Sequence, residues 1–237
     1  MIGEISGPTP ISGFSNILGS ASYRLVYDLV KSGFSVVSPN GPWQGLDFPS
    51  HLIEHLRKQG FNRFYALGHS AGGVVAAWTI LNNPGLFSKA VIADAPLTQG
   101  STGFYFTDLA VRSEQVKIPQ LLVWGRGDSQ ASVGNAFAWM DHADPSLAVM
   151  KIFDYYHDWT GTAAELQVRQ QIVDFLKGVN EPAKLPSSSG SGSSALSSEL
   201  QNVVYRGNIS GVADALLLGT ALLGSVAYLI FKKKKEK

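Results

Sequence analysis

Gly68-His69-Ser70-Ala71-Gly72 is the stretch that decides the expected fold, because it lies between a strand-like run and a helix-like run. Residues 63–67, which are apolar after Arg63, predict a buried strand, and residues 73–81 predict a helix that packs on a sheet. A serine between two such elements is typical of the sharp turn called a nucleophile elbow. Its glycines allow a tight backbone turn, and the N–H groups that begin the helix favour a developing negative charge.

Strand-like and helix-like segments alternate on both sides of this pentapeptide, which predicts an α/β fold with a mainly parallel sheet and helices on both faces. The length of 237 residues allows one such domain, expected over residues 1–180, and an appendage. The expected strands lie near residues 35–39, 63–68, 89–95, 120–125 and 148–154. The expected helices lie near residues 20–32, 48–59, 71–83, 132–142 and 163–178.

An acid and a histidine that could act with Ser70 follow it in the chain. Asp128 comes just after one strand-like run, and His157 follows the next one directly. Both residues should therefore lie at the same edge of the sheet as Ser70. In such a triad Ser70 attacks an acyl carbonyl, His157 takes and returns the proton, and Asp128 orients the histidine. Asp94, at the end of the strand after the elbow helix, is the alternative acid.

Other kinds of site find little support in the sequence. There are no cysteines, which excludes disulfides and cysteine-bound zinc, and no phosphate-binding or dinucleotide-binding motif is present. His51 and His55 have a spacing that could bind a metal, but a third ligand is missing, so we expect no metal and no cofactor. The net charge of +1 includes +4 from the last six residues, which leaves residues 1–231 at −3, so we expect no nucleic-acid partner.

These motifs resemble those of the α/β-hydrolase superfamily, and the resemblance covers residues 9–178. It implies esterase, lipase, thioesterase or peptidase chemistry without a cofactor, with Ser70, Asp128 and His157 as the triad and the N–H of Ala71 as one oxyanion donor. The matching pieces are Ser38-Pro39, Gly68-His69-Ser70-Ala71-Gly72-Gly73, Leu122-Val123-Trp124-Gly125-Arg126-Gly127-Asp128, and His157 before a last helix with Asp174-Phe175-Leu176.

The segment expected to supply a second oxyanion donor departs from the family pattern. Many members have a His-Gly pair after the third strand, whereas this chain has Ser12-Gly13-Phe14. Because the donor is a backbone group, the N–H of Phe14 or of the neighbouring Gly13 can serve. The first two strands usual in the family are not found, so either the sheet is short on its N-terminal side or Met1 is not the true start.

The segment between the third and fourth expected strands also departs from the pattern. Residues 97–119 are too few for the helical cap that many members carry, so the site is expected to be open. Within this segment, Phe104, Tyr105 and Phe106 either line an acyl pocket or pack as ordinary core.

The chain changes character after residue 180. Residues 181–211 form a Ser/Gly-rich linker and juxtamembrane segment. Residues 212–231 are long and apolar enough to predict one transmembrane helix, and residues 232–237 form a basic tail. We therefore expect a single-pass membrane protein of the endoplasmic reticulum or the mitochondrial outer membrane. Its topology stays open, since the missing signal sequence and the terminal lysines favour opposite orientations.

Taken together, these patterns predict a membrane-anchored, lipase-like serine esterase that cleaves carboxylic esters or thioesters through an acyl-enzyme. Its substrate would be a small molecule or a lipid acyl group. Two alternatives remain. One is a non-catalytic interaction module of the same fold at a membrane, and the other is a cofactor-free haloperoxidase-like perhydrolase that shares the triad.

Overall fold

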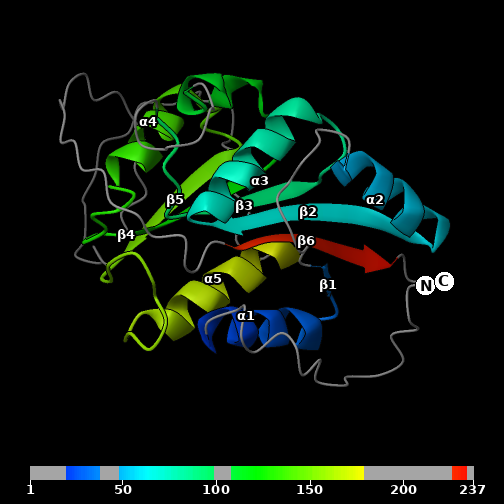
Figure 1. Ribbon diagram of the computed structural model, residues 1–237, viewed down its shortest axis with the longest axis horizontal. Helices are drawn as coiled ribbons and strands as arrows, with labels where there is room; N and C mark the ends of the chain where they lie inside the picture. The colour runs from blue at the N-terminus through cyan, green and yellow to red at the C-terminus, as the bar shows by residue number, and fades with distance from the viewer. Residues whose placement is uncertain (1–19, 38–47, 99–107, 179–225, 234–237) are drawn as a thin grey trace, which may run out of the picture.

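The structure, a computed structural model, describes residues 20–37, 48–98, 108–178 and 226–233 (Figure 1). These residues form a six-stranded sheet in the order β1-β6-β2-β3-β4-β5. Strands β2 to β5 run parallel to one another, whereas β6 runs antiparallel to both of its neighbours. The strands are β1 (Ser35–Val37), β2 (Phe61–His69), β3 (Lys89–Ala93), β4 (Gln120–Gly125), β5 (Ala148–Phe153) and β6 (Val226–Lys233).

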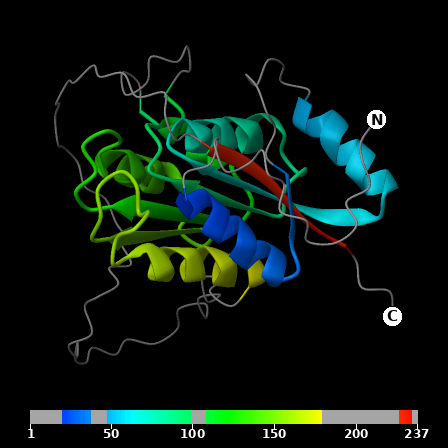
Figure 2. The same cartoon turned by 60° about the horizontal axis from the view of Figure 1, so that its bottom comes forward.

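Helices cover both faces of this sheet, as Figures 1 and 2 show. One face carries α1 (Ser20–Lys31) and α5 (Glu165–Lys177). The other face carries α2 (Phe48–Lys58), α3 (Ala71–Asn82), α4 (Gly134–His142) and the short 3-10 helix η1 (Ala110–Gln115). The apolar positions of α1 show why it packs there, since Leu25 and Leu29 lie four residues apart on one side and are buried.

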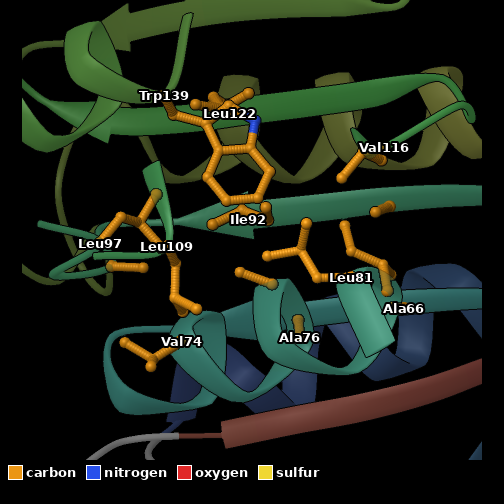
Figure 3. Close-up of a cluster of buried hydrophobic side chains, with 14 of the residues drawn as sticks. Ala66, Val74, Ala76, Leu81, Ile92, Leu97, Leu109, Val116, Leu122 and Trp139 are labelled. Carbon is orange, nitrogen blue, oxygen red and sulfur yellow. The ribbon is translucent and has the colours of Figure 1, made fainter. Parts of the chain in front are cut away.

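The central strands bury side chains on both faces. On β3, Ile92 points toward α3, while Val91 points toward α1 and α5. All residues of β3 and β4 are buried, which is why each strand is a continuous apolar run after its first residue, Lys89 or Gln120. Figure 3 shows Ile92 and Leu122 packed with Trp139 of α4.

The α/β class and the mainly parallel sheet predicted from the sequence are confirmed. All five predicted strands and all five predicted helices are present among the described residues. The boundaries differ slightly, since the strand predicted over 63–68 spans Phe61–His69 and the helix predicted over 132–142 begins at Gly134. Two elements were not predicted: η1, which is too short to show a helical pattern, and β6.

The helix predicted over residues 212–231 is wrong for residues 226–231, which form part of β6. A short apolar run does not distinguish a buried strand from a helix, and here β6 pairs on both sides, with β1 and β2. That pairing satisfies its backbone N–H and C=O groups, as a helix would. Lys232 and Lys233, which were assigned to a basic tail, extend the same strand. In the part of the chain that the structure describes, no helix is long and apolar enough to cross a membrane.

Several predictions fall on residues outside the described ranges. These are the linker at 181–211, residues 212–225 of the predicted helix, the second oxyanion donor at Gly13 or Phe14, and the pocket residues 104–106.

Candidate active site

Ser70 occupies the sharp turn between β2 and α3. Its backbone has φ 57° and ψ −127°, a conformation that is rare and strained for a residue with a side chain. Two backbone hydrogen bonds hold the turn: the Ser70 N–H donates to the Ala93 carbonyl at 2.9 Å, and the Gly73 N–H donates to the Ser70 carbonyl at 2.9 Å. A Cβ at Gly68 would lie 2.0 Å from the Gly72 carbonyl oxygen, so the turn requires glycine there. The local sequence thus builds the strained serine turn that the pentapeptide predicts.

His157 connects Ser70 with Asp128. Its Nδ1 lies 2.9 Å from Asp128 Oδ2, and its Nε2 lies 2.8 Å from Ser70 Oγ. An ionised carboxylate only accepts hydrogen bonds, so Nδ1–H donates to Asp128 and Nε2 accepts the proton of the Ser70 hydroxyl. The arrangement is therefore poised to move the serine proton onto the histidine.

The Asp128 carboxylate is fixed from its other side. Its Oδ1 accepts the N–H groups of Gln130 at 2.8 Å and Ala131 at 2.9 Å. The Asp128 side chain has no exposed surface, and that of His157 is 16% exposed. The Asp128 carboxylate that faces His157 is consequently shielded from water, while the histidine keeps access to solvent.

Close backbone packing brings the Asp128 turn and the His157 loop together. The Arg126 N–H donates to the Phe153 carbonyl at 2.8 Å, and the Gly127 N–H donates to the Tyr155 carbonyl at 3.0 Å. A Cβ at Gly125 would lie 1.9 Å from the Tyr156 carbonyl oxygen, so only glycine fits between the two segments. This glycine therefore sets the distance between the acid and the histidine.

Asp94, the alternative acid, has different partners. Its Oδ1 accepts the Gly125 N–H at 2.8 Å, its Oδ2 accepts the Tyr155 O–H at 2.8 Å, and the same Oδ2 lies 3.5 Å from Nε2 of His69. Asp94 is fully buried and has φ 45°, so its position at the end of β3 is strained. The structure brings Asp128, not Asp94, to His157.

Burial and mutual contact shift the pKa values of Asp94, His69 and Tyr155. Burial raises the pKa of Asp94, and contact with His69 only partly offsets it. Burial by itself lowers the pKa of His69, yet the hydrogen bond and charge of Asp94 outweigh it and raise the pKa above the usual histidine value. Burial, followed by the Asp94 charge, raises the pKa of Tyr155 well above its usual value, so this hydroxyl remains a hydrogen-bond donor.

The structure describes only some of the remaining candidate site residues. Ala71 is the first residue of α3, and the first N–H groups of a helix have no partner within that helix. His55 of α2 contacts Gln59 on the surface, with 3.0 Å between their Nε2 atoms. Within the described ranges, no group of three or more His, Asp or Glu side chains is arranged to hold a metal ion.

The sequence did not predict the role of His69 or of Tyr155. His69 entered the sequence analysis only as part of the elbow pentapeptide, and Tyr155 lies just beyond the strand predicted over residues 148–154. The sequence held one indication of the roles of His69 and Tyr155: Asp94 lies at a strand end beside the elbow, and a carboxylate in that position needs polar partners.

Comparison with known proteins shows the fold. No family model matches the chain, and no curated protein matches it. Among solved structures, the monoacylglycerol lipase of Paleococcus ferrophilus is similar at 14% identity and TM-score 0.55, over 69% of this chain and 91% of that one. A Pyrococcus furiosus esterase is similar at 17% identity and TM-score 0.52, over 68% of this chain and 77% of that one. The esterase domain of a Rhodothermus marinus protein is similar at 12% identity and TM-score 0.51, over 67% of this chain and 79% of that one. The chain therefore has the α/β-hydrolase fold of these structures.

Proposed function

We propose that this protein is a serine hydrolase that cleaves carboxylic esters or thioesters through an acyl-enzyme. The observation that carries the proposal is the continuous set of hydrogen bonds from Ser70 through His157 to Asp128, at 2.8 and 2.9 Å. The strained backbone of Ser70 adds support, since strain of this kind is concentrated at functional sites. The fold also agrees, although fold alone does not define an activity.

In the first half of the reaction, Ser70 Oγ attacks the carbonyl carbon of the ester or thioester, and its proton passes to Nε2 of His157. The imidazolium that forms is stabilised by the carboxylate of Asp128 through Nδ1–H. When the tetrahedral intermediate collapses, the bond from carbon to the leaving group breaks. The Nε2 proton then goes to the departing alkoxide or thiolate.

In the second half, water attacks the carbonyl carbon of the acyl-enzyme. His157 takes a proton from this water at Nε2 and returns it to Ser70 Oγ as the carbon–Oγ bond breaks. The products are the free carboxylic acid and the regenerated serine. A histidine that keeps part of its surface exposed suits this step, because the water must reach it.

Negative charge on the carbonyl oxygen requires donors in both halves. We assign one donor to the N–H of Ala71, because the N-terminus of α3 begins there and its dipole favours an anion. The second donor, Gly13 or Phe14, stays part of the proposal on the resemblance, and the acyl pocket of Phe104, Tyr105 and Phe106 stays part of it on the sequence alone. Each removed donor of this kind typically costs about 10²–10³ in kcat.

Hydrolysis of a p-nitrophenyl ester series from acetate to decanoate, together with one acyl thioester, tests the proposal. The parent chain should release p-nitrophenol or thiol at a rate that the Ser70→Ala variant loses. Circular dichroism checks that both proteins are folded. A folded parent that is no faster than Ser70→Ala on every substrate would refute the proposed function.

Association with a membrane of the endoplasmic reticulum or the mitochondrial outer membrane is a second, separate proposal. It rests on the apolar residues 212–231 and on the lysines of residues 232–237. Because residues 226–231 lie in β6 and residues 212–225 alone are shorter than the roughly 20 residues that span a bilayer, this proposal does not include the helix predicted over 212–231. Fractionation of cells tests it: the chain should sediment with these membranes, and a chain found entirely in the supernatant contradicts the proposal.

A further inference from the structure

A second pair of histidine and carboxylate lies next to the proposed triad. His69 Nε2 is 3.5 Å from Asp94 Oδ2. The Asp94 side chain has no exposed surface, and that of His69 is 14% exposed. Asp94 is itself held by the Gly125 N–H and the Tyr155 hydroxyl, each at 2.8 Å. The carboxylate that faces His69 is thus fixed from two sides by groups on β4 and on the His157 loop.

His69 contacts the main chain of His157 directly. Its Nε2 lies 2.8 Å from the His157 carbonyl oxygen. Since a carbonyl only accepts, this nitrogen must carry a proton, and it does so both in the neutral tautomer with a proton on Nε2 and in the cation. The nearby Asp94 carboxylate favours that same proton. His69 therefore remains a donor to His157 whether or not it is charged.

Aromatic packing closes the loop around His69. Trp159 meets its ring edge-on, with 4.8 Å between centroids and 73° between planes. The rings of His69 and His157 are 5.1 Å apart, and Tyr155 packs edge-on against Trp159 at 6.0 Å. Trp159 thus packs directly on the side chain that holds the His157 carbonyl, and Tyr155 packs in turn on Trp159.

We propose that His69 is a positioning residue. It binds the main-chain carbonyl of His157, and Asp94 fixes the orientation of the His69 ring. Together these contacts set the position of the His157 imidazole relative to Ser70. The inference rests on the proposed function. It gives His157 two anchors: Asp128 holds its side chain and His69 holds its backbone. A misplacement of about 1 Å in such a site can lower the rate about 10²-fold, so the second anchor matters for catalysis.

Substitutions at His69 separate positioning from simple packing. His69→Phe fills the space but removes the donor, and His69→Gln keeps a donor near the same place. His142→Phe, on the exposed last turn of α4, is the matched control. We expect kcat for a p-nitrophenyl ester to fall about 10- to 100-fold in His69→Phe with little change in KM. His69→Gln should recover most of the loss, and His142→Phe should equal the parent.

A proton NMR measurement reports on the geometry without using activity. The His157 Nδ1–H that donates to Asp128 should give a downfield resonance that Asp128→Asn removes. His69→Phe should shift or broaden this resonance, while His69→Gln and His142→Phe should leave it near the parent position. If His69→Phe does not fold, Asp94→Asn is measured instead, and it should shift the same resonance by a smaller amount.

The two readouts distinguish the possible failures. An unchanged resonance in folded His69→Phe, or in Asp94→Asn where that variant replaces it, overturns the positioning role even if the parent is an active esterase. Equal loss of kcat in folded His69→Phe and His69→Gln overturns it too, because restoring the donor should restore the rate. If the parent shows no activity but the resonance shifts as expected, the proposed function fails while the structural role of His69 stands.

Discussion

Replacing Asp128 by asparagine tests which acid serves His157. The two N–H groups of Gln130 and Ala131 donate to Oδ1, so the amide oxygen of asparagine must take that place. The amide NH₂ then occupies the place of Oδ2, which lies 2.9 Å from Nδ1 of His157. Because the NH₂ group can only donate, Nδ1 must become the acceptor. The proton moves to Nε2, where it faces Ser70 and blocks proton transfer.

The expected cost follows from this reversed tautomer. A triad with the wrong tautomer loses about 10⁴-fold in kcat. At about 1.36 kcal/mol for each factor of ten, this corresponds to roughly 5.4 kcal/mol of transition-state stabilisation. The shape of the side chain is nearly unchanged and its two bonds to backbone N–H groups remain. We therefore expect folding stability to change far less than activity does.

The assay compares kcat for a p-nitrophenyl ester in the parent, Asp128→Asn and Asp94→Asn, with urea unfolding of each protein alongside. Asp94→Asn should lose at most about tenfold, since Asp94 acts on His69 and not on the His157 ring. Asp128 is not the acid if Asp128→Asn keeps a tenth or more of the parent rate while Asp94→Asn loses it. That result would make Asp94 the acid.

Three further substitutions test other parts of the structure. Gly125→Ala places a Cβ 1.9 Å from the Tyr156 carbonyl, so esterase activity should be lost and the melting temperature should fall. Ile92→Ala removes a fully buried side chain of β3 and should cost about 2–5 kcal/mol in urea unfolding. Glu165→Gln tests pH dependence. Burial raises the pKa of Glu165, but the Gly161 N–H and the Arg24 guanidinium outweigh this and lower it below its usual value. The stabilisation is present above the unfolded pKa of about 4.3 and is lost as the pH falls through the folded pKa, so Glu165→Gln should show a shallower loss of stability in acid.

For each of these three substitutions, one result would contradict the expectation. Gly85→Ala is the control for Gly125→Ala, because Gly85 has φ 84° and a Cβ added there would meet nothing within 4 Å, so it tests backbone strain alone. Equal effects of the two alanines would contradict the role of close packing at Gly125. An Ile92→Ala cost below about 1 kcal/mol would contradict a rigid core around β3. Parallel acid-unfolding curves for the parent and Glu165→Gln would contradict the ionised Glu165 contact with Arg24.

Local patterns explain why so much of the fold could be predicted. Strands β3 and β4 are buried on both faces, so their residues form apolar runs that stand out from the helices around them. The C-terminal ends of parallel strands lie at one edge of the sheet, so the sequence predicted that Ser70, Asp128 and His157 lie close together. The glycines of the elbow marked the turn, because their tight packing leaves a sequence signature.

Long-range pairing explains what the sequence did not reveal. The apolar residues of β6 fit both a membrane helix and a buried strand, and only contact with β1 and β2 distinguishes these. The pairing of His69 with Asp94 was not predicted either, although the two residues end neighbouring strands, because no local pattern shows which polar group meets the Asp94 carboxylate. The hydrogen bond from His69 to the His157 carbonyl depends on the loop that follows β5, whose path no local pattern predicts.

The proposed function requires that Ser70 is an activated nucleophile. Treatment of the full chain with a fluorophosphonate probe, followed by mass spectrometry of the labelled peptide, tests it most directly. We predict covalent labelling at Ser70 in the parent, none in Ser70→Ala, and strongly slowed labelling in Asp128→Asn. A folded parent that stays unlabelled, or a Ser70→Ala variant that is labelled as strongly as the parent, would contradict an activated Ser70.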